Sequence, residues 1–180
     1  MSANNISKAS VIPALFQDAL ALAYQSLDIY FDNPTQLDLA FGSNYNQTVA
    51  SQLFTAFSQG DFSSVPEIKI LSDEVLGATN GAYSASKNQI YLNERFLSAN
   101  AGNVKAIASV IIEEIGHYID AQINTTDSAG DEGDIFARLV QGETLTSNVL
   151  ANLKAEDDSK TIVLGGEAVE IEPTFRTSKK

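Results

Sequence analysis

Hydrophobic and polar residues alternate along this chain with two different periods. Five stretches are predicted to be helices, most clearly where apolar side chains recur every three or four positions. The predicted helices cover residues 10–30, 46–59, 104–123, 130–142 and 145–155. The first is expected to end near Asn33 and Pro34, because proline restricts the residue before it to extended conformations. The second is expected to end at Gly60.

Shorter apolar runs predict strands. The predicted strands are residues 67–71, residues 89–92 and the two β-rich runs that flank Gly165 and Gly166. The paired glycines are typical of a two-residue hairpin turn. The segment from Leu76 to Ser86 holds two glycines and an asparagine, and it is predicted to be a loop.

Together these elements predict an α+β fold that is rich in helix, with a small mixed or antiparallel sheet and a C-terminal β-hairpin. A length of 180 residues fits one domain. We place this domain at residues 1–173 and expect residues 174–180 to form a flexible tail. Hydrophobic residues make up 44% of the chain, which is enough for a sizeable core.

The composition excludes several kinds of site. Cysteine is absent, which rules out disulfides, thiolate metal sites and a cysteine nucleophile. The only histidine is His117, so no site in this chain can contain two histidines. This excludes the paired motifs of di-iron bundles, which need two. The net charge of −12 argues against nucleic acid and anionic membrane surfaces as partners.

Acidic residues are concentrated in the second half of the chain. Residues 110–172 hold 14 of the 23 acids but only 3 of the 11 bases. Such a distribution indicates either cation binding or a solvated face.

Nothing in the sequence predicts a membrane segment. No stretch approaches the roughly 20 apolar residues that span a bilayer, so we expect no membrane insertion. The polar start MSANNISKAS differs from a secretory signal. We therefore expect a cytoplasmic protein, one secreted by a signal-less route, or a domain of a longer chain.

The predicted helix with the only histidine carries the candidate chemistry. At 100° of rotation per residue, Glu113, His117, Asp120 and Asn124 fall within about 60° of one another. Apolar side chains, mostly isoleucines, fill the opposite arc, so this polar stripe is predicted to point away from the core. A solvated face is the simplest interpretation. However, Gly116 interrupts the helix at a cost of about 1 kcal/mol, which indicates that another backbone approaches closely.

The run NQIYLNERFLSANAGNVKAIASVIIEEIGHYIDAQ resembles the core of the zincin metallopeptidases, in which an edge strand precedes a helix with the motif H-E-x-x-H. The resemblance implies that Glu114 is the general base and His117 a metal ligand. Glu113 stands where the family has its first histidine ligand. The residues that resemble the substrate-binding edge strand are Ile90, Tyr91, Leu92 and Asn93. The longer pattern EEIGHYIDAQINTTDSAGDEGDIF also resembles a domain of large cyanobacterial haemolysin-type calcium-binding proteins.

The zincin resemblance also implies a third ligand on the following helix. Asp131 and Glu132 are the candidates, while the usual spacing of the family would place the ligand at Gly130. Asp120 and Asn124 would then orient the ligands from outside the coordination sphere. Zinc is the metal that the family implies, and one imidazole with carboxylates also suits manganese, iron or calcium.

These residues lead to a hypothesis of a metal-dependent hydrolase, specifically a peptidase. The metal would lower the pKa of a bound water, and Glu114 would take its proton before attack on a peptide or protein substrate. The alternative is a catalytically inactive zincin-like or calcium-binding module of a larger secreted protein. A helical domain without a metal is the third interpretation.

Calcium is considered because acids are dense after the central helix. Asp127, Asp131, Glu132 and Asp134 offer the oxygen ligands that calcium prefers. The EF-hand template fails, because Glu132 stands at its glycine position and Arg138 at its final glutamate position. The same acids would also complement the positive end of a helix.

Overall fold

The computed structural model describes residues 3–157 and 159–174 of the chain. Its helices are α1 (Ala3–Phe31), α2 (Leu37–Phe41), α3 (Gln47–Phe57), α4 (Asp73–Leu76), α5 (Glu94–Ala99), α6 (Val104–Ile123), α7 (Glu132–Val140) and α8 (Ser147–Leu153). Its strands are β1 (Ile68–Leu71), β2 (Gly81–Ser84), β3 (Gln89–Asn93), β4 (Lys160–Leu164) and β5 (Glu167–Thr174). Each predicted helix is present. Most of the helix ends lie within a few residues of the predicted ones, but α1 begins at Ala3 rather than at residue 10.

The five strands form one mixed sheet in the order β1-β3-β2-β5-β4. Strands β1 and β3 are parallel, and the other neighbouring pairs are antiparallel. Leu164 pairs with Glu167 across the β4–β5 turn, and the two glycines between them have φ angles of 58° and 89°. Positive φ at both positions is what a two-residue hairpin turn of this type requires. The predicted α+β class, the mixed sheet and the C-terminal hairpin are thus confirmed.

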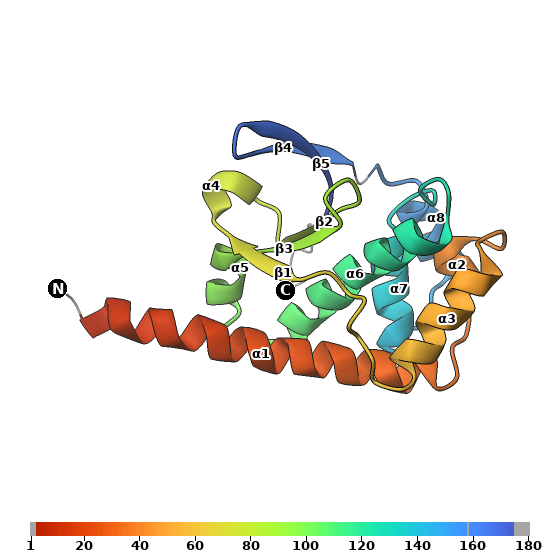
Figure 1. Cartoon of the computed structure of the whole chain (residues 1–180), viewed down its shortest axis with the longest axis horizontal. Coiled ribbons are helices and arrows are strands. Elements are labelled where there is room, and N and C mark those ends of the chain that lie inside the picture. Colours follow the sequence, from red (N-terminus) through yellow and green to blue (C-terminus); the bar gives the residue numbers. More distant parts are fainter. Residues whose placement is uncertain (1–2, 158, 175–180) are drawn as a thin grey trace.

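Helix α6 lies at the centre of the molecule, with α1 along one side, the sheet on another and α7 beside it (Figure 1). The main hydrophobic core lies between these elements, and Leu27, Phe57, Ile111 and Phe136 are completely buried in it. A smaller apolar cluster covers the other face of the sheet, where it joins α4 to the β4–β5 hairpin. None of the described helices combines the length and apolar composition that a membrane span needs.

Strand β2 occupies part of the segment that was expected to be a loop, so that prediction is wrong. All four of its residues are buried. A Cβ on Gly81 would lie 2.5 Å from Oε1 of Glu114 and 2.6 Å from Cγ1 of Val110. Gly81 therefore permits close contact between β2 and α6, rather than forming a turn.

Strand β3 is not an edge strand, which contradicts the expectation for a substrate-binding strand. It lies between β1 and β2, and its backbone pairs with both neighbours. Ile90, Tyr91, Leu92 and Asn93 are at most 5% exposed. The Asn93 side chain caps α5 by accepting a hydrogen bond from the Arg95 backbone at 2.8 Å. A peptide therefore has no free edge to pair with at β3.

The expectation that Thr174 belongs to a flexible tail is wrong. Thr174 is the last residue of β5 and is completely buried. Residues 175–180 lie outside the described residues.

Candidate metal centre

The polar stripe of α6 is buried, so the prediction that it faces water is wrong. Glu113, Glu114, His117 and Asp120 are each at most 2% exposed. Helix α7 and strands β2 and β5 pack over this face. Burial of three acids and a histidine on one helix face requires compensating contacts, because isolated buried charges are costly.

Two glycines allow α7 to approach α6. A Cβ on Gly116 would lie 3.0 Å from the Cα of Gly133, and a Cβ on Gly133 would collide with the imidazole of His117. This contact confirms that Gly116 marks the close approach of a second backbone. It also places the first residue of α7, Glu132, against the imidazole.

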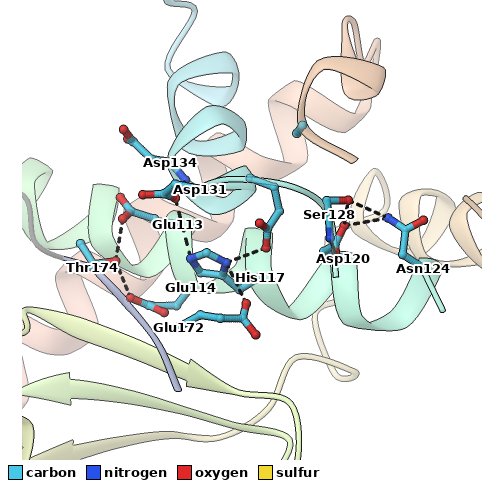
Figure 2. Close-up of polar contacts among 12 residues, drawn as sticks. Glu113, Glu114, His117, Asp120, Asn124, Ser128, Asp131, Asp134, Glu172 and Thr174 are labelled. Atoms are coloured by element: carbon cyan, nitrogen blue, oxygen red, sulfur yellow. Dashed lines mark hydrogen bonds and ion pairs between the residues drawn. The ribbon is translucent and has the colours of Figure 1, made fainter. Parts of the chain in front are cut away.

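His117 lies among three carboxylates. Its Nδ1 atom is 2.7 Å from Oε1 of Glu132, on α7, and 3.0 Å from Oε2 of Glu172, on β5. Its Nε2 atom packs near Gly133 and is 4.0 Å from Oδ1 of Asp131. Figure 2 shows the imidazole between Asp131 on one side and Glu172 on the other. Nδ1 is therefore the nitrogen that faces the paired carboxylates.

The hydroxyl of Thr174 joins the two adjacent glutamates of α6 (Figure 2). Its Oγ1 atom is 2.7 Å from Oε1 of Glu113 and 2.6 Å from Oε1 of Glu114. A hydroxyl has one hydrogen to donate, so one of the two carboxyls must be protonated and donate to Oγ1. Burial raises the pKa of Glu114 well above its ordinary value, and the charge of Glu113 adds to this, against the attraction of His117. We therefore assign the proton to Glu114, which donates to Thr174, while Thr174 donates to Glu113.

Asp120 and Asn124, which were expected to orient the metal ligands, instead bind the loop after α6. Oδ1 of Asp120 accepts hydrogen bonds from Oγ of Ser128 at 2.6 Å and from Nδ2 of Asn124 at 2.7 Å. Oδ2 of Asp120 accepts from the Ser128 backbone at 3.1 Å. The carboxylates that face Nδ1 of His117 are those of Glu132 on α7 and Glu172 on β5.

Asp131 and Asp134 stabilise the start of α7. Oδ1 of Asp131 accepts from the backbone nitrogen of Asp134 at 2.7 Å, which is an N-cap. Asp134 forms an ion pair with Arg138 at 2.9 Å. These contacts fit the interpretation of the acids as partners of a helix N-terminus.

Burial and charge act in opposite directions on His117 and Glu132. Burial raises the pKa of Glu132 to about 7, against the attraction of His117. Burial acts to lower the pKa of His117, but the charges and hydrogen bonds of Glu132 and Glu172 outweigh it and raise this pKa well above its ordinary value. One imidazole thus stands among more carboxyl groups than it can neutralise, since Glu113 and Asp120 are buried nearby.

Two groups of described residues bring ligand atoms close enough to hold a metal ion, with one atom per residue within 4.8 Å of the others. The groups are His117, Glu132 and Glu172, and Asp120, Asp127 and Glu132. The structure thus brings together the expected His117 and Glu132. Neither group contains Glu113 or Asp131, which were also expected to be ligands.

Glu172 was not among the residues predicted to form the site. Strand β5 alternates, so that Val169 and Ile171 join the smaller apolar cluster while Glu172 faces the opposite side of the sheet. A glutamate in an alternating strand normally indicates a solvated face. Only the pairing of Glu172 with Tyr83 of β2 carries it over α6. No local signal in the sequence distinguishes it from the other glutamates of this strand.

A surface pocket of about 190 Å³ borders the cluster. Its walls include His117, Asp120 and Glu172, together with residues 124–127 of the loop after α6. The pocket thus opens toward members of both groups, whereas Glu132, which the groups share, is completely buried behind it.

Comparisons with known proteins found no match to any family model, any curated protein or any solved structure. Function is therefore inferred from the cluster around His117 alone.

Proposed function

We propose that this domain binds a divalent metal ion through His117, Glu132 and Glu172, and that the ion fastens strand β5 to helices α6 and α7. The observation that carries the proposal is the position of Nδ1 of a buried histidine, within 3.0 Å of carboxylate oxygens from two other elements. One imidazole with two carboxylates is a donor set that suits zinc or manganese.

The spacing of the donors supports this assignment. Ligands of a tetrahedral ion with bonds of about 2.1 Å lie about 3.4 Å apart. The observed separations from Nδ1 are 2.7 Å and 3.0 Å, so each carboxylate would retreat by less than about 1 Å. The ion would replace the proton on Nδ1, because a histidine ligand must be neutral.

The second oxygen of Glu132 gives independent support. Oε1 contacts His117, whereas Oε2 is buried and has no hydrogen-bond partner within the described part of the chain. An unpaired buried oxygen of this kind costs about 1–3 kcal/mol. Coordination of a cation would remove that cost, and it would favour the carboxylate form that burial disfavours.

Metal content measured by mass spectrometry, after purification without added metal, tests the proposal. Wild type is expected to retain zinc or manganese, and Glu172→Gln is expected to bind it at least about tenfold more weakly. Glu170→Gln is the matched control, because Glu170 is exposed on the same strand. A wild-type protein that holds neither metal, and whose melting temperature does not rise when either is added, would refute the site.

Hydrolysis of a peptide or protein is a second candidate function, favoured by the position of Glu114 beside the candidate centre. A glutamate whose pKa is raised by burial has the property required of a general acid or base. In the described conformation its carboxyl is completely buried and bonded to Thr174. Catalysis would therefore require β5 to move away from α6.

A peptidase assay on the metal-loaded protein tests this second candidate. Glu114→Gln should lower the rate by at least about 100-fold if Glu114 is the base. Glu94→Gln, an exposed glutamate at the start of α5, is the control. An equal rate in the wild type and in Glu114→Gln would exclude this role.

A further inference from the structure

We propose that the domain also holds a second cation, of the calcium type, between Asp120, Asp127 and Glu132, so that Glu132 bridges two ions. We call the proposed ion position at His117, Glu132 and Glu172 the first site. The inference rests on the proposed function only because the two sites share Glu132. The second site uses oxygen ligands alone, and neither His117 nor Glu172 belongs to it.

The three carboxylates fit around one large cation. Each offers an oxygen within 4.8 Å of the other two. Calcium–oxygen bonds are about 2.4 Å long, so ligand oxygens on opposite sides of the ion lie up to about 4.8 Å apart. The three carboxylates therefore lie close enough together to reach one ion after small side-chain shifts.

Glu132 supplies the observation that points to a ligand. Its side chain is completely buried, and one carboxylate oxygen is occupied by His117. The other oxygen has no hydrogen-bond partner among the residues that the structure describes.

Hydrogen bonds fix the position of the Asp120 carboxylate. Hydrogen bonds from Ser128 and Asn124 fix both of its oxygens. Oδ1 accepts two of these bonds, whereas Oδ2 accepts one, from the Ser128 backbone, and keeps a second lone pair for a cation. Ser128 and Asn124 therefore position Asp120 for coordination, in addition to closing the loop.

The surrounding pocket favours calcium over smaller cations. Asp127 is exposed at the pocket, and Asn124, Thr125 and Thr126, which carry amide and hydroxyl groups, also line it. Calcium accepts six to eight oxygens, including carbonyls and water, in irregular geometry. Magnesium demands near-ideal octahedral geometry, which a loop of this kind does not impose. Among the described residues, none that lines the pocket is a lysine or an arginine.

The test dialyses the full chain against zinc and calcium together and counts both metals by mass spectrometry. Wild type should hold calcium in addition to zinc. Asp127→Asn should bind calcium at least about tenfold more weakly and keep its zinc. Glu172→Gln should lose zinc and keep calcium. Asp32→Asn, an exposed aspartate that follows α1, is the control.

The outcomes separate this inference from the proposed function. Calcium binding in Asp127→Asn equal to that of wild type, or a wild type that holds zinc alone, overturns the second site. Loss of both metals in Glu172→Gln also overturns it, because it shows one site rather than two. A wild type that holds calcium but no zinc refutes the proposed function and leaves the second site supported.

Discussion

At the scale of single residues, the proton between Glu114 and Thr174 distinguishes two neighbouring glutamates that are equivalent in the sequence. The single hydroxyl hydrogen of Thr174 cannot serve both carboxyls, and burial favours the neutral form of Glu114. The sequence motif assigns Glu114 the role of a base. In the tertiary structure its carboxyl is completely buried and hydrogen-bonded to Thr174 of the C-terminal strand.

Substitution of these residues tests the assignment. Glu114→Gln should change the free energy of unfolding at neutral pH by less than about 1 kcal/mol, because the amide hydrogen replaces the carboxyl hydrogen. Thr174→Val should lower it by about 2 kcal/mol, since it leaves two buried oxygens without their partner. Urea denaturation of both variants measures the difference. If Glu114→Gln were as destabilising as Thr174→Val, the proton would not be on Glu114.

At the scale of elements, two neighbouring acids at the start of α7 have different roles, which their positions in the sequence do not reveal. Asp131 caps the helix, and Glu132, the next residue, contacts the imidazole of His117. Both are acids at a helix N-terminus, so composition alone leaves them equivalent. Gly133 decides between them, because its missing side chain lets the backbone of α7 lie against the ring.

If Asp131 acts as a helix cap and not as a metal ligand, two substitutions of Asp131 should differ in their effect on stability. Asp131→Ala should lower the free energy of unfolding by about 1 kcal/mol through loss of the cap. Asp131→Asn should keep the cap and cost less than half as much, since asparagine caps helices about as well as aspartate. Thermal unfolding and metal content should be measured on both. Loss of the bound metal in a folded Asp131→Asn would instead make Asp131 a ligand.

At the scale of the whole molecule, the buried acids make the metal-free protein sensitive to pH. The pKa of Glu132 rises from 4.5 to about 7 on folding, chiefly through burial, and the groups that face it are His117, Asp120 and Glu172. The pKa of His117 is also raised in the folded state. Between about pH 4.5 and 7 the folded state thus holds more protons than the unfolded state, and its stability falls as pH rises.

The corresponding measurement compares melting temperatures at about pH 5 and about pH 8, with a chelator and with zinc. The chelated protein should be less stable at the higher pH, by on the order of 1–3 kcal/mol. Zinc should stabilise the protein more at the higher pH, because it competes with fewer protons. Greater stability of the chelated protein at the higher pH would contradict the direction of these pKa shifts.

The sequence by itself determined the features that depend on local spacing. Helical periods predicted α1, α3, α6 and α7, and the paired glycines predicted the β4–β5 turn, because residues three to four apart, or two in a turn, are neighbours in any fold. Gly116 correctly indicated a second backbone, since glycine inside a helix is otherwise a cost. The family resemblance also indicated His117 with either Asp131 or Glu132, and of these two acids the structure brings Glu132 to the imidazole.

Only the tertiary structure decided which side chains are buried and which acids meet. The pairing of β5 with β2 joins residues far apart in the chain, and it alone brings Glu172 to His117 and Thr174 to the glutamates of α6. The same pairing turns a helix face that looks solvated into a buried cluster. A strand's hydrogen-bonding partner is set by contacts over the whole chain rather than by local periodicity, so these positions could not be predicted from the sequence.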